Sequence, residues 1–66
     1  MVDNFLLKAL INKLEGDIEV SKANILVYVR NSVGIGEHID IVETIEKEVQ
    51  KIADAEDKIK AIQKHF

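Results

Sequence analysis

Apolar residues recur along the first half of the chain at alternating steps of four and three positions. A mean recurrence of 3.5 residues places side chains on one face of an α-helix, so the pattern predicts a helix over about 4–30. Asp3 and Asn4 both suit its N-cap position. Ser21 is the polar member of this stripe, and a small polar residue at a core position can set the register between helices. The stripe consists of Leu7, Ile11, Leu14, Ile18, Ser21, Ile25 and Tyr28.

Two features of this stretch allow other structures. Gly16 costs about 1 kcal/mol relative to alanine inside a helix, and the chain could bend there into two shorter helices. The spacing continues across Gly16 without a change of phase, which favours one continuous helix. Residues 25–29 are all apolar and would also suit a buried strand. Because a lone strand has no evident partner in this sequence, a helix surrounded by other helices is the preferred interpretation.

A second apolar stripe follows a glycine-containing connection at about 31–38 and predicts a helix over about 39–64. Acidic residues gather in its first turns and basic residues in its last third, which complements the helix macrodipole at both ends. The two helices predict an all-α fold, an antiparallel helical hairpin that forms one domain over residues 1–66. The second stripe consists of Ile41, Val42, Ile45, Val49, Ile52, Ala55, Ile59, Ile62 and Phe66.

The apolar stripes are wider than one hairpin can bury. Two antiparallel helices cover one face of each other and leave the flanks of both stripes open, and an open apolar strip signals an interface. A chain of 66 residues buries only about 60% of its unfolded surface, and such small chains usually need a partner. We therefore expect a homo-oligomer, with a dimer favoured, in which hairpins pack into a helical bundle. The flank residues expected at this interface are Leu6, Leu10, Leu26, Val29 and Ile62. The core expected inside the hairpin consists of Leu7, Leu10, Ile11, Leu14, Ile18, Ile25, Tyr28, Ile45, Val49, Ile52, Ile59 and Ile62.

Charge and composition narrow the classes of function. The net charge of −3 lacks the basic footprint of nucleic-acid binding, so no nucleic-acid partner is expected. No stretch approaches the 18 or so apolar residues of a membrane span, and the first residues lack the basic region of a secretory signal. A cytoplasmic location without membrane association is the expectation. Cysteine is absent, which excludes disulfides and thiolate metal sites.

The connection between the helices holds the candidate binding residues. Glycines ahead of a helix can form a nest of N–H groups for an anion, and Glu37, His38 and Asp40 carry metal-ligating atoms. However, the two carboxylates would repel a phosphate, and three ligands within four positions cannot converge on one ion. Turn-forming glycines and an N-cap or surface histidine are therefore preferred, and no cofactor or metal is assigned. The candidate interaction loop consists of Val33, Gly34, Ile35, Gly36, Glu37 and His38.

Residues 31–66 carry a family resemblance. The sequence VGIGEH at 33–38, followed by DIVE at 40–43, AEDK at 55–58 and a terminal KHF, resembles a group of small, functionally uncharacterised proteins of tailed phages that infect marine cyanobacteria. That group has proline where this chain has Ile39, and proline suits the first position of a helix. The resemblance implies no activity. It implies a phage protein made in the cytoplasm of a bacterial host.

The sequence favours a non-enzymatic protein that associates with itself and then binds another phage or host protein through its loop or its acidic face. No hydroxyl group has a histidine at helical spacing, so no catalytic residue is assigned. The alternative is a small ligand-binding or metal-binding protein that uses the loop at 34–38.

Overall fold

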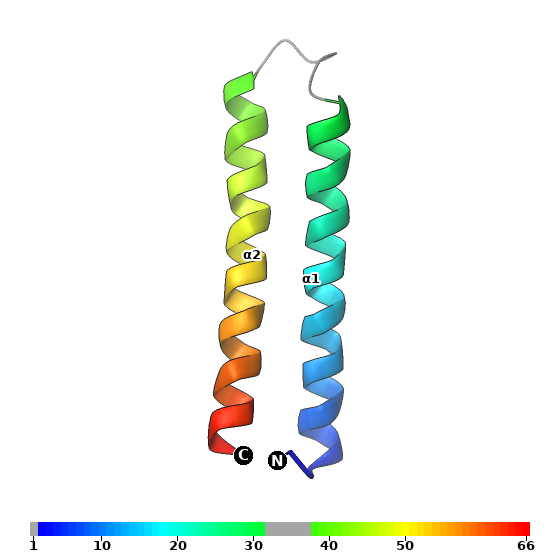
Figure 1. Cartoon of the computed structure of the whole chain (residues 1–66), viewed down its shortest axis with the longest axis vertical. Coiled ribbons are helices and arrows are strands. Elements are labelled where there is room, and N and C mark those ends of the chain that lie inside the picture. Colours follow the sequence, from blue (N-terminus) through cyan, green and yellow to red (C-terminus); the bar gives the residue numbers. More distant parts are fainter. Residues whose placement is uncertain (1, 32–37) are drawn as a thin grey trace.

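Two long antiparallel helices lie side by side (Figure 1). The computed structural model describes residues 2–31 and 38–66. Helix α1 spans Phe5–Asn31 and helix α2 spans His38–His65. The chain termini lie at the same end of a rod with dimensions of 49 × 14 × 12 Å. The predicted all-α antiparallel hairpin is confirmed, and assembly into a larger bundle stays a prediction.

The helix ends agree with the predicted bounds to within about one residue. The side-chain oxygen of Asn4 accepts hydrogen bonds from the backbone N–H groups of Leu6 and Leu7, at 2.8 and 3.3 Å. Asn4 is therefore the N-cap, which satisfies N–H groups that the first turn of a helix leaves without partners. At the other end of α1, the side-chain amide of Asn31 donates to the carbonyl oxygen of Val27 at 2.9 Å. Helix α1 therefore includes Asn31, the first residue of the predicted connection, whose side chain bonds to the last turn.

Both ambiguous stretches of the first half are helical. Helix α1 continues through Gly16 without a break, and a Cβ atom added there would meet nothing within 4 Å. Residues 25–29 also belong to α1, so the preferred helical interpretation is confirmed. Helix formation there follows the spacing of the whole stripe, which outweighs the local preference of β-branched residues for strands.

The core is a thin layer between the two helices. Leu14, Ala55 and Ile62 form its buried centre, and Ile41 is buried closer to the loop end. Partly buried hydrophobic residues that pack against the centre are Val2, Leu7, Ile11, Ile18 and Ile59. Within the described ranges, no large side chain is completely enclosed. A two-helix layer therefore shields its apolar residues only on the faces that meet.

Two residues expected in the core lie outside it, so that part of the core prediction is wrong. Leu10 is 41% exposed and Val49 is 51% exposed. Both exposures follow from the side of each helix that faces its neighbour. That side carries Leu7 and Leu14 on α1 and Ile45 and Ile52 on α2. Leu10 and Val49 lie beside these residues at helical geometry. Conversely, Ile62 is buried between the helices, which matches its expected core role but removes it from the open flanks.

Candidate functional site

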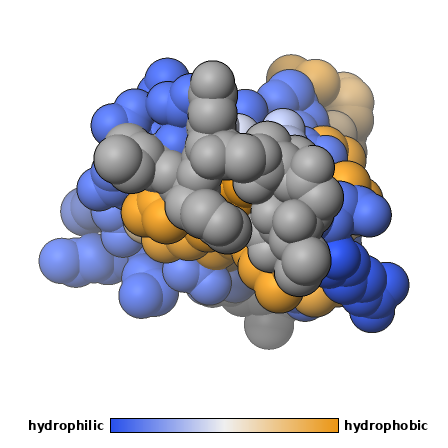
Figure 2. Space-filling view, turned by 90° about the horizontal axis from the view of Figure 1, so that it is seen from above, coloured by the Kyte–Doolittle hydropathy of each residue, from blue (hydrophilic) through white to orange (hydrophobic). Residues whose placement is uncertain are grey.

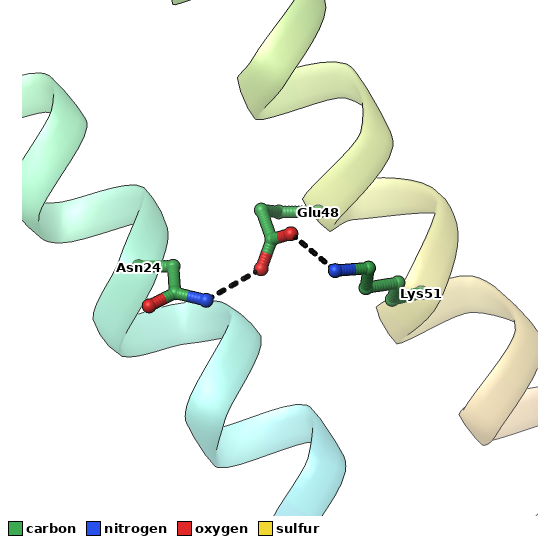
Figure 3. Close-up of polar contacts among 3 residues, drawn as sticks. All are labelled: Asn24, Glu48 and Lys51. Atoms are coloured by element: carbon green, nitrogen blue, oxygen red, sulfur yellow. Dashed lines mark hydrogen bonds and ion pairs between the residues drawn. The ribbon is translucent and has the colours of Figure 1, made fainter.

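A polar cluster interrupts the apolar contact between the helices. Its members are Ser21 and Asn24 on α1 and Glu48 and Lys51 on α2. Glu48 is 6% exposed and Ser21 is 2% exposed, although both carry polar side chains. One carboxylate oxygen of Glu48 accepts a hydrogen bond from the Asn24 amide at 2.8 Å (Figure 3). The other carboxylate oxygen forms an ion pair with the Lys51 ammonium group, also at 2.8 Å.

The helical repeat places Glu48 in the interior. Starting from Ile41, steps of four and three residues pass through Ile45, Glu48, Ile52 and Ala55. Glu48 therefore occupies a core position of α2 in the way that Ser21 occupies one on α1. The small side chain of Ser21 faces this position and leaves room for the carboxylate. The hydrogen bond between Asn24 and Glu48 also fixes the axial register of the two helices, because it requires these two residues to lie opposite each other.

The electrostatics of the cluster favour the ionised form of Glu48. The hydrogen bond from Lys51 lowers the pKa of the Glu48 carboxyl group most, and the hydrogen bond from Asn24 lowers it further. Burial opposes this shift, and the Lys51 charge and the Ser21 hydroxyl add to it. Reciprocally, the hydrogen bond and negative charge of Glu48 raise the pKa of Lys51. Every buried side-chain polar atom in the described residues has a hydrogen-bond partner, as stable interiors require.

An open groove of about 350 Å³ runs beside this cluster. It is amphipathic, because charged residues of both signs from the two helices surround exposed Val20 and the buried Leu14 and Ala55. Its lining residues are Leu14, Asp17, Val20, Ser21, Asn24, Glu48, Lys51, Asp54, Ala55 and Lys58. The lowered pKa of Glu48 makes this carboxylate a weaker base than an ordinary glutamate. The geometry therefore suits a structural ion pair better than proton transfer.

The groove defines two opposite flanks of the hairpin. The groove flank carries the exposed side chains of Leu6, Leu10, Val20 and Val27 on α1, which share their side of the helix with Asp17 and Asn24 by 3.6-residue geometry. The far flank carries exposed side chains on the opposite side of both helices, namely Leu26, Val29, Val42 and Val49. Viewed from the loop end, hydrophobic surface reaches the outside of the hairpin between hydrophilic side chains (Figure 2).

The structure separates the residues predicted for the interface. Leu6 and Leu10 lie on the groove flank, Leu26 and Val29 lie on the far flank, and Ile62 lies in the core. Within the predicted interaction loop, His38 begins α2, whereas Val33, Gly34, Ile35, Gly36 and Glu37 lie outside the described residues. In the described ranges, no group of three or more metal-ligating side chains comes together.

Sequence reasoning missed Asn24 and Glu48. The signal for Glu48 was available, because the 4-3 spacing from Ile41 leads directly to it. Val42 and Val49, which the predicted stripe includes, are apolar but lie one position away from the side of α2 that faces α1. For Asn24 the sequence holds no comparable signal, because its role depends on which residue of the other helix lies opposite.

Comparisons with known proteins add no assignment. The chain matches no known family model, no curated protein and no solved structure. Neither α1 nor α2 is apolar over a long enough stretch to cross a membrane. The observations that bear on function are therefore the polar cluster, the groove and the two exposed apolar flanks.

Proposed function

We propose that this protein is a non-enzymatic, self-associating helical module that acts through protein–protein contacts. One observation carries the proposal: a two-helix layer with a thin core leaves large apolar side chains exposed on both of its flanks. In the described part of the chain, ten large hydrophobic residues are exposed, among them Phe5, Val27 and Phe66. Clusters of exposed apolar side chains mark interaction surfaces more often than the free surface of a monomer.

Self-association completes the core that one hairpin lacks. Two hairpins that pack side by side form a four-helix bundle, in which each flank residue exchanges water for apolar contacts. Each buried leucine or valine contributes about 1.5–3 kcal/mol, so a few such residues stabilise a small domain appreciably. The homodimer is the simplest such assembly, and closed twofold symmetry is the commonest form among oligomers.

Sedimentation equilibrium over micromolar to millimolar concentrations tests the proposal. We expect a monomer–dimer equilibrium, with the dimer dominant at the upper end. Circular dichroism on the same samples should show high helical content throughout. A chain that stays fully folded and monomeric over this range would contradict self-association.

Binding of a further protein from phage or host, in a bacterial cytoplasm, belongs to the same proposal. Its support is the resemblance of residues 31–66 to phage proteins and the acidic character of the second half of the chain. Affinity capture from infected host cells, repeated with uninfected cells, tests it. A partner recovered only from infected cells is the expected result, and recovery of nothing beyond the chain itself would count against it.

A further inference from the structure

We infer that the far flank, and not the groove flank, is the surface on which a second copy of this chain packs, with the loop ends of both hairpins at the same end. This inference rests on the proposed self-association and goes further, because it selects one surface and one orientation. Both flanks are apolar in part, so the choice depends on what else each of them would bury.

The groove flank is costly to remove from water. Its apolar residues surround a groove lined by Asp17, Asp54 and Lys58, together with Lys51 of the polar cluster. The Lys51 side chain is largely exposed while it pairs with Glu48. A second copy on this flank would desolvate these charges, and ionised groups tolerate burial only with complete partners.

The far flank is cheaper to desolvate. Asn24 and Glu48 face each other, and the two helices run in opposite directions. Val29, five residues after Asn24, therefore lies beside the turn of α2 that contains Val42. Leu26 and Val49 continue the patch toward the middle of the rod. These four side chains come from both helices and form an apolar surface over the loop-proximal half of the flank. Its charged neighbours are Glu46 on α2 and Glu19 and Lys22 on α1, and the last two neutralise each other in an ion pair at 3.0 Å.

The distribution of residues along the far flank selects the orientation. Its other half is more polar, because Lys8 and Glu15 on α1 and Glu56 and Gln63 on α2 occupy there the helical positions of Val29, Val42 and Val49, although the exposed Phe5 shares the position of Leu26. A stable dimer buries about 800 Å² on each partner, and the hairpin is 49 Å long but only 14 Å wide. Contact must therefore extend along most of the rod. Only a twofold axis parallel to the rod brings apolar half onto apolar half over that length, and neighbouring helices then alternate in direction, as in four-helix bundles.

A matched pair of lysine substitutions in the full chain tests the choice of flank. Val42 on the far flank and Val20 on the groove flank are both valines in helices, 65% and 61% exposed. Because a lysine charge at the interface would be buried, Val42→Lys should weaken dimerisation about tenfold or more. Val20→Lys should leave the dissociation constant close to that of the unchanged protein. Sedimentation equilibrium gives the constants, and circular dichroism confirms that both variants remain helical.

The other outcomes separate this inference from the proposed function. If Val20→Lys dissociates the dimer and Val42→Lys does not, or if both do, self-association stands and the assignment to the far flank is overturned. If the unchanged protein is monomeric at every concentration, both the proposed function and this inference fail.

A spin label tests the orientation, because the chain contains no cysteine of its own. Lys64 is exposed near the end of α2, away from the far flank. In the labelled Lys64→Cys dimer, we expect a distance between labels well below the 49 Å length of the hairpin. A distance longer than the hairpin would mean that the copies overlap only at their loop ends, which overturns the proposed orientation.

Discussion

Glu48 shows how one polar residue in a core position can define the alignment of two helices. Its carboxylate bonds to Asn24 across the interface and to Lys51 along its own helix. Sliding the helices by one heptad would separate Glu48 from Asn24 and Ser21 and place it against an apolar layer. Such a slip leaves the buried carboxylate with its intrahelical partner Lys51 alone, and a buried charge that loses a hydrogen-bond partner costs more than a few lost apolar contacts. The cluster therefore acts against alternative registers, in the same way as a polar residue at a coiled-coil core position.

The lowered pKa of Glu48 predicts that stability depends on acidity. Since the folded-state pKa lies below the unfolded-state value of about 4.3, ionised Glu48 contributes stability above that value. The contribution is lost as the pH falls through the folded-state pKa. Urea unfolding between pH 7 and pH 3 should therefore show a smaller decline for Glu48→Gln than for the unchanged protein. Glu43→Gln, at an exposed position of the same helix, is the control and should follow the unchanged protein.

Replacing Glu48 by leucine separates stability from register. An apolar side chain removes the buried carboxylate, and Asn24 and Lys51 can turn to water at the groove. We expect Glu48→Leu to be at least as stable as the unchanged protein, because hydrophobic replacement of a buried ion pair is often neutral or stabilising. Its amide spectrum by NMR should broaden or multiply as other registers become populated. A single sharp set of signals would show that the apolar layers fix the register without Glu48.

At the scale of elements, Gly16 lowers the stability of α1 although no packing contact requires a glycine there. Glycine has more freedom in the unfolded chain than alanine, and an added Cβ atom would meet no neighbour. We expect Gly16→Ala to raise the free energy of unfolding by about 0.5–1 kcal/mol. Thermal unfolding followed by circular dichroism measures the gain. An unchanged or lower melting temperature would indicate that α1 needs a bend at this position.

The N-cap of α1 gives a prediction of the opposite sign. Asn4→Ala removes the acceptor for the N–H groups of Leu6 and Leu7 and should cost about 0.5–2 kcal/mol. Asn12→Ala, in the exposed interior of the same helix, should instead be neutral or slightly stabilising, because alanine is the better helix former. Urea titration of the two variants side by side tests the capping role. Equal effects would assign the change to asparagine in general and not to the cap.

At the scale of the whole molecule, the proposed self-association predicts that stability depends on protein concentration. Among the described residues, the core centre consists of Leu14, Ala55 and Ile62, so Leu14→Ala, at a typical cost of about 2–5 kcal/mol for a buried leucine, should unfold most of the chain. Leu6→Ala, at an exposed position of the groove flank, should have a small effect. Because binding of a second copy stabilises the folded state by mass action, the melting temperature should also rise with protein concentration. A melting temperature independent of concentration would contradict this linkage.

Both helices can be predicted from the order of residues along the chain. Helical periodicity and capping depend on neighbours within a few positions along the chain, so the bounds of α1 and α2, the continuity through Gly16 and the antiparallel pairing could all be predicted. The width of the apolar stripes also predicted that flank residues such as Leu26 and Val29 would be exposed.

The side chains that meet between the helices depend on how the two helices pack. The enclosure of Glu48, its bond to Asn24, the exposure of Val49 and the burial of Ile62 depend on the rotation and level of one helix against the other. Those two quantities follow from the combined packing of both stripes, and a helix can turn by one position at little local cost. The separation of the predicted interface residues onto two opposite flanks has the same origin. Periodicity along one helix fixes a face, whereas the direction of that face depends on the helix beside it.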